Sequence, residues 1–303
     1  MTDLEPERER CVFCRTELKR DAVAWVARCP RCALLRSRLD DPRESGARHL
    51  AEEDRESGLE PLRRANFTRL LDRLSRLVEP RGTRLLEVGC GHGWFLEAAK
   101  ARGFRAEGIE PDAPVAARAR ARGAEVREGL FPDCLRENEA WDVLVMNDVF
   151  EHLPDPPAAL AACARHLSAN GLLVINLPTS SGAVYRIGAL LARLGVSSVF
   201  DRLWQRGYPS PHLFYFTASN LDRMAEGAGF GLAAGGTLPS IELRGLWARL
   251  RMDRTHSWAG AAAAYLGLSA AYPFLRWLLP SDIALRVYRR EEKLALVQTP
   301  PAG

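Results

Sequence analysis

The sequence predicts an α/β fold with a doubly wound sheet, preceded by a small cysteine-bearing module. Two observations predict it. From residue 83 onward, short apolar segments alternate with helical patterns, an order typical of parallel strands connected by helices. Before that, two Cys-x-x-Cys pairs lie within residues 11–32, a spacing typical of metal-binding knuckles.

The elements follow in a clear order. Residues 40–80 are charged and have apolar residues at helical spacing, until Pro80 and Gly82 break the pattern. Strands are expected at 83–88, 104–110, 124–129, 141–147, 171–178 and 282–290. Helices are expected at 94–103, 112–123, 156–167 and 220–230. Residues 180–215 are expected to be less regular.

The composition sets broad limits on function. The chain has 303 residues, 47% of them hydrophobic, with a net charge of +4. This is enough for one large domain with additions or for two modest domains, and the charge is too small to indicate nucleic-acid binding. The first ten residues lack the apolar stretch of a secretory signal, so a cytoplasmic location with reduced cysteines is expected.

The N-terminal module is predicted to bind zinc. Cys11 and Cys14 form one pair, Cys29 and Cys32 the other, with 14 residues between the pairs. Four thiolates at the corners of a tetrahedron suit Zn²⁺ and leave no open position for a substrate, which favours a structural site. The alternatives are four buried free cysteines or a ribbon without metal.

The strand at 83–88 leads into a glycine-rich turn. Glu87 precedes Gly89, Gly91 and Gly93, and glycines there let the backbone turn tightly and approach a ligand. The spacing differs from the dinucleotide pattern Gly-x-Gly-x-x-Gly. Since Glu87 would repel a pyrophosphate, it suits an amine or a hydroxyl. The alternative is the NAD-binding turn of a Rossmann fold.

An acidic residue, Glu110, ends the second strand and is followed by Pro111. An acid at this position can bind both hydroxyls of a ribose. The alternative is an ordinary solvated loop acid.

These segments resemble the class I S-adenosylmethionine-dependent methyltransferases, of the type 11 and type 23 kind. Residues 85–96 resemble the family's first motif, 108–112 the second, 141–156 the fourth and 167–178 the fifth. The resemblance extends over about residues 83–230 and implies a Rossmann-like, doubly wound, seven-stranded methyltransferase sheet.

Four segments are therefore expected. They are a zinc ribbon (1–40), a helical linker or cap (41–82), an S-adenosylmethionine-binding domain (83–235) and a C-terminal extension with an apolar helix and a last strand (236–303).

The resemblance also implies the residues that contact the cofactor. The glycines would pack against its methionine and ribose parts, Glu110 would bind the ribose diol, Leu130 and Phe131 would flank the adenine, and Asn147 and Asp148 would lie beside the methionine. The expected cofactor-binding set is Glu87, Gly89, Cys90, Gly91, Gly93, Glu110, Pro111, Leu130, Phe131, Asn147 and Asp148.

Glu151 and His152 follow the fourth strand, near where a methyl acceptor is expected. A histidine there can act as a general base on a hydroxyl, because its pKa is near neutral. Alternatively, His152 braces its loop. A divalent metal at Glu151 and His152 is implied by the resemblance to ubiquinone-pathway O-methyltransferases.

A third catalytic candidate is His212, within residues 208–217. This segment resembles a loop that covers the acceptor pocket in glycan- and quinone-type members, which makes His212 a substrate contact or a base. The alternative is that the His212 imidazole only forms hydrogen bonds within the loop. Trp204, Tyr208 and Tyr215 are expected to line the pocket or to pack the core.

Residues 258–279 form a strongly apolar segment that includes Trp258 and Tyr265. A buried or cap helix, an interfacial helix and a membrane span are all compatible with its length and composition. Peripheral membrane contact through 258–279 would fit a lipid-linked acceptor.

The function predicted is methylation, with O-methylation favoured, of a small molecule, sugar, glycan or lipid-linked acceptor. One alternative is an RNA methyltransferase that recognises its substrate through the ribbon. Against it, residues 147–150 read Asn-Asp-Val-Phe, not the Asn-Pro-Pro-Tyr type of base-amino methylation. The other alternative, a non-catalytic binding protein with this fold, is disfavoured by the intact glycine turn and Glu110.

Overall fold

The computed structural model describes residues 9–38, 52–240, 242–243, 245–251, 257–278 and 280–291. The predicted segments 1–40, 41–82 and 236–303 each extend outside these described residues, and so does the apolar segment at Leu279.

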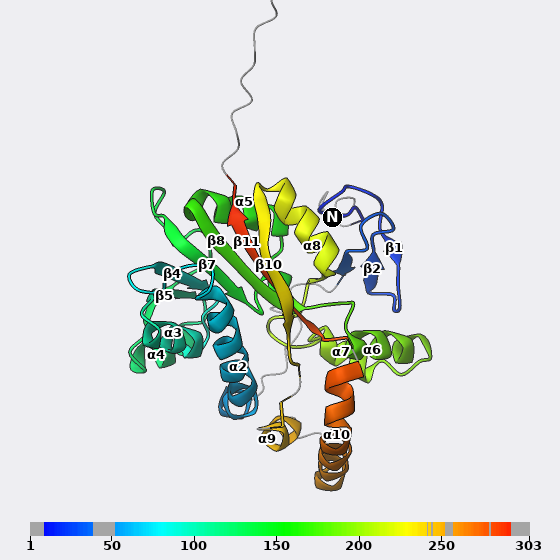
Figure 1. The fold of residues 1–303 in the computed structure, drawn as a ribbon. Helices are drawn as coiled ribbons and strands as arrows, with labels where there is room; N and C mark the ends of the chain where they lie inside the picture. The colour runs from blue at the N-terminus through cyan, green and yellow to red at the C-terminus, as the bar shows by residue number, and fades with distance from the viewer. Residues whose placement is uncertain are drawn as a thin grey trace, which may run out of the picture.

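A seven-stranded sheet forms the centre of the molecule (Figure 1). Its spatial order is β10-β11-β8-β7-β4-β5-β6. The strands are β4 (Arg84–Val88), β5 (Arg105–Glu110), β6 (Glu125–Glu128), β7 (Trp141–Asn147), β8 (Leu167–Pro178), β10 (Phe230–Leu238) and β11 (Ile283–Arg290). The predicted seven-stranded, doubly wound sheet is confirmed.

The sheet is mixed at one end, where the sequence pattern predicted parallel strands. β4 to β8 are parallel, while β11 runs antiparallel to β8 and β10. The reason is geometric. β10 ends opposite the start of β11, with Leu238 facing Ile283. The chain therefore leaves and re-enters the sheet at the same end of the strands, which makes β10 and β11 antiparallel. The sheet therefore runs across the boundary predicted at 235/236.

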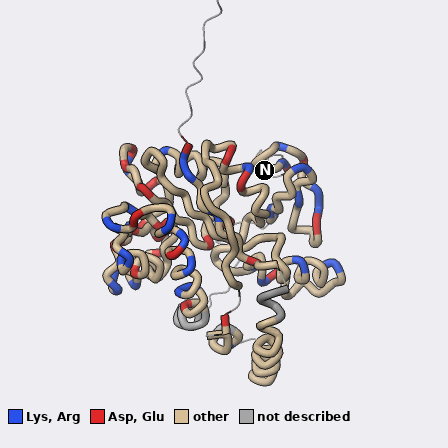
Figure 2. Tube along the Cα trace, viewed as in Figure 1, with Lys and Arg blue, Asp and Glu red and all other residues tan. Residues whose placement is uncertain are grey.

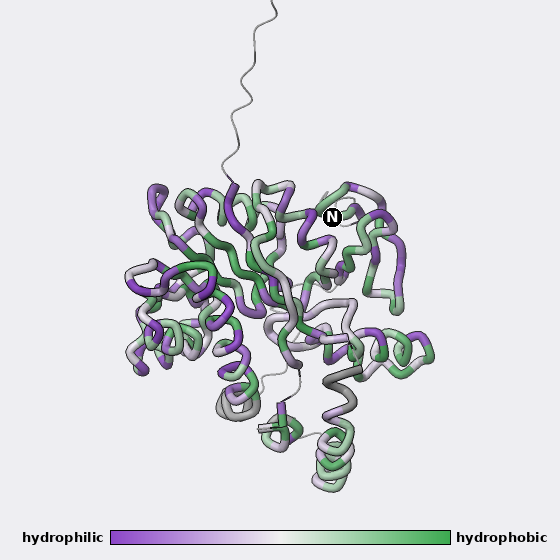
Figure 3. Tube along the Cα trace, in the orientation of Figure 1, coloured by the Kyte–Doolittle hydropathy of each residue, from purple (hydrophilic) through white to green (hydrophobic). Residues whose placement is uncertain are grey.

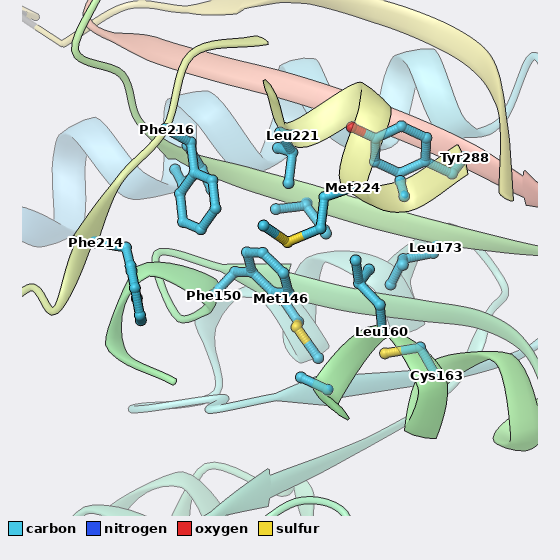
Figure 4. Close-up of a cluster of buried hydrophobic side chains, with 14 of the residues drawn as sticks. Met146, Phe150, Leu160, Cys163, Leu173, Phe214, Phe216, Leu221, Met224 and Tyr288 are labelled. Atoms are coloured by element: carbon cyan, nitrogen blue, oxygen red, sulfur yellow. The ribbon is translucent and has the colours of Figure 1, made fainter. Parts of the chain in front are cut away.

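Helices cover both faces of the sheet. One face packs on α2 (Glu52–Leu74) and α3 (Trp94–Ala101), with α4 (Ala113–Ala121) beside them; the other packs on α5 (Pro156–His166) and α8 (Ala218–Gly227). Side chains alternate accordingly: Val143 and Val145 face α2 and α3, whereas Leu144 and Met146 belong to the second core. Figure 4 shows Met146 in that second core, with Leu160 of α5 and Met224 of α8.

The cysteine-bearing module forms a second, small sheet. Its strands are β1 (Lys19–Arg20), β2 (Val26–Arg28) and β3 (Leu35–Ser37), and the fourth strand, β9 (Phe214–Tyr215), comes from the distant loop after His212. Because β3 pairs with β9, the ribbon is joined to the larger domain by backbone hydrogen bonds.

Residues 180–215, expected to be less regular, contain two helices, α6 (Ala183–Arg193) and α7 (Ser198–Leu203). α6 buries Tyr185 and Ala189 but exposes Ile187 and Leu190, so apolar residues occupy both of its faces. The helix is nonetheless strongly amphipathic, so its periodicity was a usable signal that the sequence prediction did not use.

Between β10 and β11 the chain forms α9 (Leu246–Arg251) and α10 (Trp258–Leu278). α10 projects from the body, and Figure 3 shows it as mostly apolar. The Trp258 and Leu266 side chains are 67% and 68% exposed. Within the described residues, none of the helices combines the length and hydrophobicity that crossing a membrane requires.

Candidate functional site

The glycine turn lies at the carboxyl edge of the sheet, between β4 and α3. Gly89, Gly91 and Gly93 have φ values of +68°, +52° and +78°, in the left-handed region that favours glycine. A Cβ at Gly89 would lie 2.5 Å from Val149 Cγ2, whereas one at Gly91 would meet nothing within 4 Å. The backbone at Gly91 is therefore open to a ligand.

Glu110 joins the first and second motifs. The backbone N–H of Gly91 donates to Glu110 Oε2 at 2.9 Å, and that of Asp112 donates to Oε1 at 3.0 Å. The residue is only 8% exposed. These contacts hold the carboxylate at the end of β5, beside the glycine turn.

A buried polar row crosses the ends of β4, β7 and β8. Asn147 Nδ2 donates to Glu87 Oε1 at 2.7 Å, and Asn176 Nδ2 donates to Asn147 Oδ1. Glu87 Oε2 is buried without a hydrogen-bond partner. Burial raises the pKa of Glu87, against the lowering effect of its bond from Asn147. The row thus presents one unsatisfied carboxyl oxygen.

Asn176 was missed from the sequence, although it is the one polar residue among the apolar positions 172–177. Asn147 directly opposes it in the sheet register. A polar residue at the carboxyl end of a buried strand is a usable signal for a ligand site.

Arg63, on α2, was also missed. Its Nη2 lies 3.6 Å from Asp148 Oδ2, and its charge lowers the pKa of both Glu87 and Glu151 against the larger, raising effect of burial. Arg63 thus contacts Asp148, and its charge also acts on Glu87 and Glu151. No local motif marks it, because only the packing of α2 brings it there.

The remaining predicted cofactor residues lie along the same edge. The Cys90 N–H donates to Ile109 O at 2.9 Å, which seats the turn against β5. Pro111 is exposed. Leu130 follows β6, is 63% exposed, and is preceded by Gly129, whose N–H donates to Glu110 O. Phe131 packs against the core.

Glu151 lies in the short 3₁₀ helix η2 (Phe150–His152) and is fully buried. Neither of its carboxyl oxygens has a hydrogen-bond partner. Burial, and then the charge of Asp148, raise the pKa of Glu151. Such a group is costly unless a ligand, proton or cation satisfies it.

His212 meets Glu151 across about 60 residues of sequence. Its Nε2 lies 3.8 Å from Glu151 Oε1 and 2.9 Å from the Gln205 amide, while its Nδ1 has no hydrogen-bond partner. Burial, and then His152, lower the pKa of His212. Its imidazole is therefore neutral at physiological pH.

His152 completes the group. Its Nδ1 donates to Pro211 O at 2.9 Å, and its ring is edge-on to His212 with 4.7 Å between centroids. The candidate ligand atoms of Glu151, His152 and His212 all lie within 4.8 Å of one another, close enough to hold a metal ion. The structure thus brings together all three predicted catalytic residues, and His152 also braces the loop.

The aromatic residues near His212 differ in burial. Trp204 and Tyr215 are fully buried, and Tyr215 lies 5.4 Å from His212 between ring centroids. The Tyr215 hydroxyl donates to Leu203 O at 2.9 Å. Both residues therefore pack the core beneath the histidine, whereas Tyr208 is half-buried.

The four ribbon cysteines converge. Cys11 Sγ lies 3.5 Å from Cys32 Sγ, and Cys14 Sγ lies 3.4 Å from Cys29 Sγ. All four sulfurs lie within 4.8 Å of one another, and none is in a disulfide. A tetrahedral zinc site needs sulfurs about 3.8 Å apart, so this donor set fits zinc. The hydrogen bond between the two thiols lowers the pKa of Cys11 and raises the pKa of Cys32.

The fold and the glycine turn held by Glu110 define a class I S-adenosylmethionine-dependent methyltransferase. A family model described as a methyltransferase domain matches residues 62–234, which is more than half of the chain. The chain belongs to this methyltransferase family.

Curated relatives agree with this class. The ubiquinone biosynthesis O-methyltransferase of Hahella chejuensis is 37% identical over 122 residues, which cover 37% of this chain and 50% of that protein. The enzyme of the same name from Chromobacterium violaceum is 28% identical over 186 residues, covering 59% and 77%. The chain thus spans about half of the first relative's length.

Solved structures agree with the fold. A chain from the complex of the Haloferax volcanii Trm112 methyltransferase activator with a putative methyltransferase aligns with a TM-score of 0.54 and 16% identity. The alignment covers 80% of this chain and 96% of that one. At this identity the likeness concerns the fold alone.

Proposed function

We propose that this protein transfers the methyl group of S-adenosylmethionine to a hydroxyl oxygen of a small molecule, sugar, glycan or lipid-linked acceptor. The observation that carries the proposal is that two groups of residues lie at the carboxyl edge of the large sheet. The glycine turn and Glu110 form one group, and Glu151, His152 and His212 form the other. The names of the curated relatives support transfer to oxygen.

The donor set suits each polar part of the cofactor. The unpartnered Glu87 Oε2 would accept from the amino group, Arg63 would pair with the carboxylate, and Glu110 would accept from the ribose hydroxyls. The open backbone at Gly91 allows close approach. The remaining predicted contacts are Gly89, Cys90, Gly93, Pro111, Leu130, Phe131, Asn147 and Asp148.

When bound, S-adenosylmethionine supplies an activated methyl sulfonium, so the chain contributes mainly positioning and proton removal. His212 is the proposed base: it is neutral because burial lowers its pKa, and its Nε2, which accepts from the Gln205 amide at 2.9 Å, has the lone pair that would take up the hydroxyl proton in place of that bond. His152, bonded to Pro211, would hold the loop that carries His212.

A second arrangement is favoured by the short distances within the same group. A divalent cation held by Glu151, His152 and His212 would polarise the acceptor hydroxyl and satisfy the buried carboxyl. The two arrangements differ in one measurement. Brief EDTA treatment that leaves the ribbon zinc in place, as checked by elemental analysis, should leave turnover intact if His212 acts as a base. The same treatment should abolish turnover reversibly if a cation at Glu151, His152 and His212 is required.

For the ribbon we propose one structural zinc ion held by Cys11, Cys14, Cys29 and Cys32. Elemental analysis of protein purified in metal-free, reducing buffer should give about one zinc per chain. A ratio near zero would show that the four cysteines do not hold zinc.

For the partners we propose a lipid surface at α10 and no nucleic acid. Residues 258–275 contain no charged side chain, and the exposed Trp258 and Leu266 offer apolar contacts. Figure 2 shows basic and acidic residues interspersed along the described chain, which does not favour an RNA substrate bound through a basic face.

The central proposal is tested in two steps. Titration calorimetry should show binding of S-adenosylmethionine and none of NAD; the reverse result would refute it. Cell extracts incubated with the protein and methyl-labelled cofactor should then yield a labelled product. Identifying that product names the acceptor and its methylated atom.

A further inference from the structure

The ribbon and the loop that carries His212 belong to the same small sheet. β3 pairs with β9 so that Leu35 faces Tyr215. The Ser37 N–H donates to Leu213 O at 2.8 Å, and the Leu213 N–H donates to Glu151 O at 2.9 Å. A path of backbone hydrogen bonds thus runs from the ribbon through the neighbour of His212 to Glu151.

Side chains of the ribbon pack on the segment before this loop. Trp25 is edge-on to Trp204 at 5.9 Å and tilted against Phe200 at 5.8 Å. The Trp204 carbonyl in turn accepts from the His212 N–H at 3.1 Å. His212 therefore lies between two residues that contact the ribbon. Trp204 packs against Trp25 of the ribbon, and Leu213 accepts a backbone hydrogen bond from Ser37 of the ribbon.

A knuckle of the cysteine cluster is fixed directly to the larger domain. The Asn220 side chain is fully buried, and its Nδ2 donates to the Cys32 carbonyl at 3.1 Å. The Asn220 Oδ1 also accepts from the Thr217 N–H at 3.0 Å, while the Thr217 hydroxyl accepts from the Asn220 N–H. This reciprocal cap starts α8. The position of Cys32 and the start of α8 are thus linked.

The ribbon strands are too short to hold this geometry alone. β1, β2 and β3 contain two or three residues each, and isolated hairpins are at best marginally stable in water. In such modules metal binding supplies the folding free energy. The glycine turn and Glu110, by contrast, are on β4 and β5, which belong to the other sheet.

We propose that metal binding at the four cysteines orders the loop that carries His212, so that the ribbon is part of the acceptor site. The ribbon then acts as a positioning element and not as a separate recognition module. Calling this loop the acceptor loop rests on the proposed function. The coupling between the metal and the loop does not.

The test measures amide hydrogen exchange on the full chain, as purified and after metal removal under reducing conditions. Metal loss should speed exchange at Ser37 and Leu213 by at least about tenfold, and added Zn²⁺ should restore their protection. The Cys90 amide, bonded to Ile109, should change by less than about twofold. Unchanged exchange at Leu213 would overturn the proposal, as would a chain that binds no metal.

Matched variants separate this coupling from general loosening. Cys29→Ser should reproduce metal loss, whereas Cys134→Ser, a half-buried cysteine outside the cluster, should not. Asn220→Ala and Thr217→Ala both disrupt the cap of α8, but only Asn220→Ala removes the bond to Cys32. Exchange at Leu213 should therefore rise in Asn220→Ala alone; equal effects in the two variants count against the proposal.

Two further experimental results have a defined interpretation. If metal removal unfolds the whole chain, the Asn220 and Thr217 pair decides the question, because both variants keep the four thiolates. If calorimetry detects no binding of S-adenosylmethionine while Leu213 still responds to metal, the proposed function fails and the coupling stands.

Discussion

The proposed cofactor residues and the proposed acceptor residues lie at one edge of the sheet but are assembled in opposite ways. Glu87, the glycine turn and Glu110 lie within residues 87–110. The backbone N–H groups of Gly91 and Asp112 donate to the Glu110 carboxylate and fix its position. Glu151 and His212 are held by contacts among segments that are far apart in the chain, including the ribbon.

The difference bears on how far each group of residues can change independently. The glycine turn is held by nearby backbone hydrogen bonds, from Gly91 to Glu110 and from Cys90 to Ile109, and none of these partners belongs to the ribbon. The proposed acceptor residues depend on the position of a two-residue strand and its ribbon partner. We therefore expect changes in the ribbon or in α6 and α7 to alter acceptor use while cofactor binding remains.

The largest effect should come from the proposed acceptor residues. His212→Ala should lower turnover by roughly 10²–10⁴-fold if His212 is the base, while cofactor affinity remains within about twofold. The measurement is steady-state kinetics with the acceptor found by methyl labelling. His166→Gln is a suitable control, because His166 is buried beside Glu139, away from the site.

The pH dependence adds a second criterion. Because burial keeps the pKa of His212 below its ordinary value near 6.5, activity should persist as pH falls through 6.5 and decline only below it. A loss of turnover smaller than about tenfold in His212→Ala would make His212 a positioning residue.

The next effect concerns the proposed cofactor residues. Glu110→Ala should weaken binding of S-adenosylmethionine by about 10–100-fold, because a charge-assisted bond contributes roughly 1.5–3 kcal/mol. Calorimetry measures it. Glu128→Ala is the matched control, since Glu128 is an exposed acid at the end of the adjacent strand β6. Equal affinities in the two variants would show that Glu110 does not bind the ribose.

A smaller effect should appear in stability. Burial raises the pKa of Glu87 above its ordinary value near 4.5, so the folded state binds this proton more tightly than the unfolded state does. Stability is then lost as pH rises above about 4.5 toward the raised pKa. Glu87→Gln does not titrate and keeps the acceptor for Asn147.

The ligand-free Glu87→Gln protein should therefore gain in Tm over the wild type as pH increases from 5 to 8, by ~2–4 °C for each ~1 kcal/mol. Thermal melts at several pH values measure this, with the exposed Glu125→Gln as control. A constant difference between variant and wild type would show that Glu87 titrates normally. Cofactor affinity should fall in the same variant.

The sequence predicted the strands whose pattern is local. β4 and β7 are mostly apolar segments with ordinary strand formers, and both were predicted. β10 was missed because Phe230–Leu238 is rich in glycine and alanine, which have low strand propensity. β9 has only two residues, and its partner lies about 180 positions earlier, so no local pattern could indicate it.

The site divides in the same way. The glycines, Glu110 and the four cysteines follow from spacing along the chain. Arg63, Gln205 and the contact between Glu151 and His212 depend on how α2, α7 and the ribbon pack. The parts played by Arg63 and Gln205, and the contact between Glu151 and His212, could not be predicted, because no local sequence motif marks them and only the fold brings these side chains together.

The smallest expected effect concerns α10, which leads into β11 at the carboxyl edge of the sheet, near the acceptor site. Each large apolar side chain that enters the interface contributes roughly 1.5–3 kcal/mol, so the exposed Trp258 and Leu266 should give weak, reversible binding. The wild type should float with phospholipid vesicles, and a variant with Trp258→Ser and Leu266→Ser should not. Leu232→Ser, an exposed leucine on β10, controls for lost surface hydrophobicity. If the wild type stays at the bottom of the gradient, α10 does not bind lipid, and a lipid-linked acceptor loses its structural support.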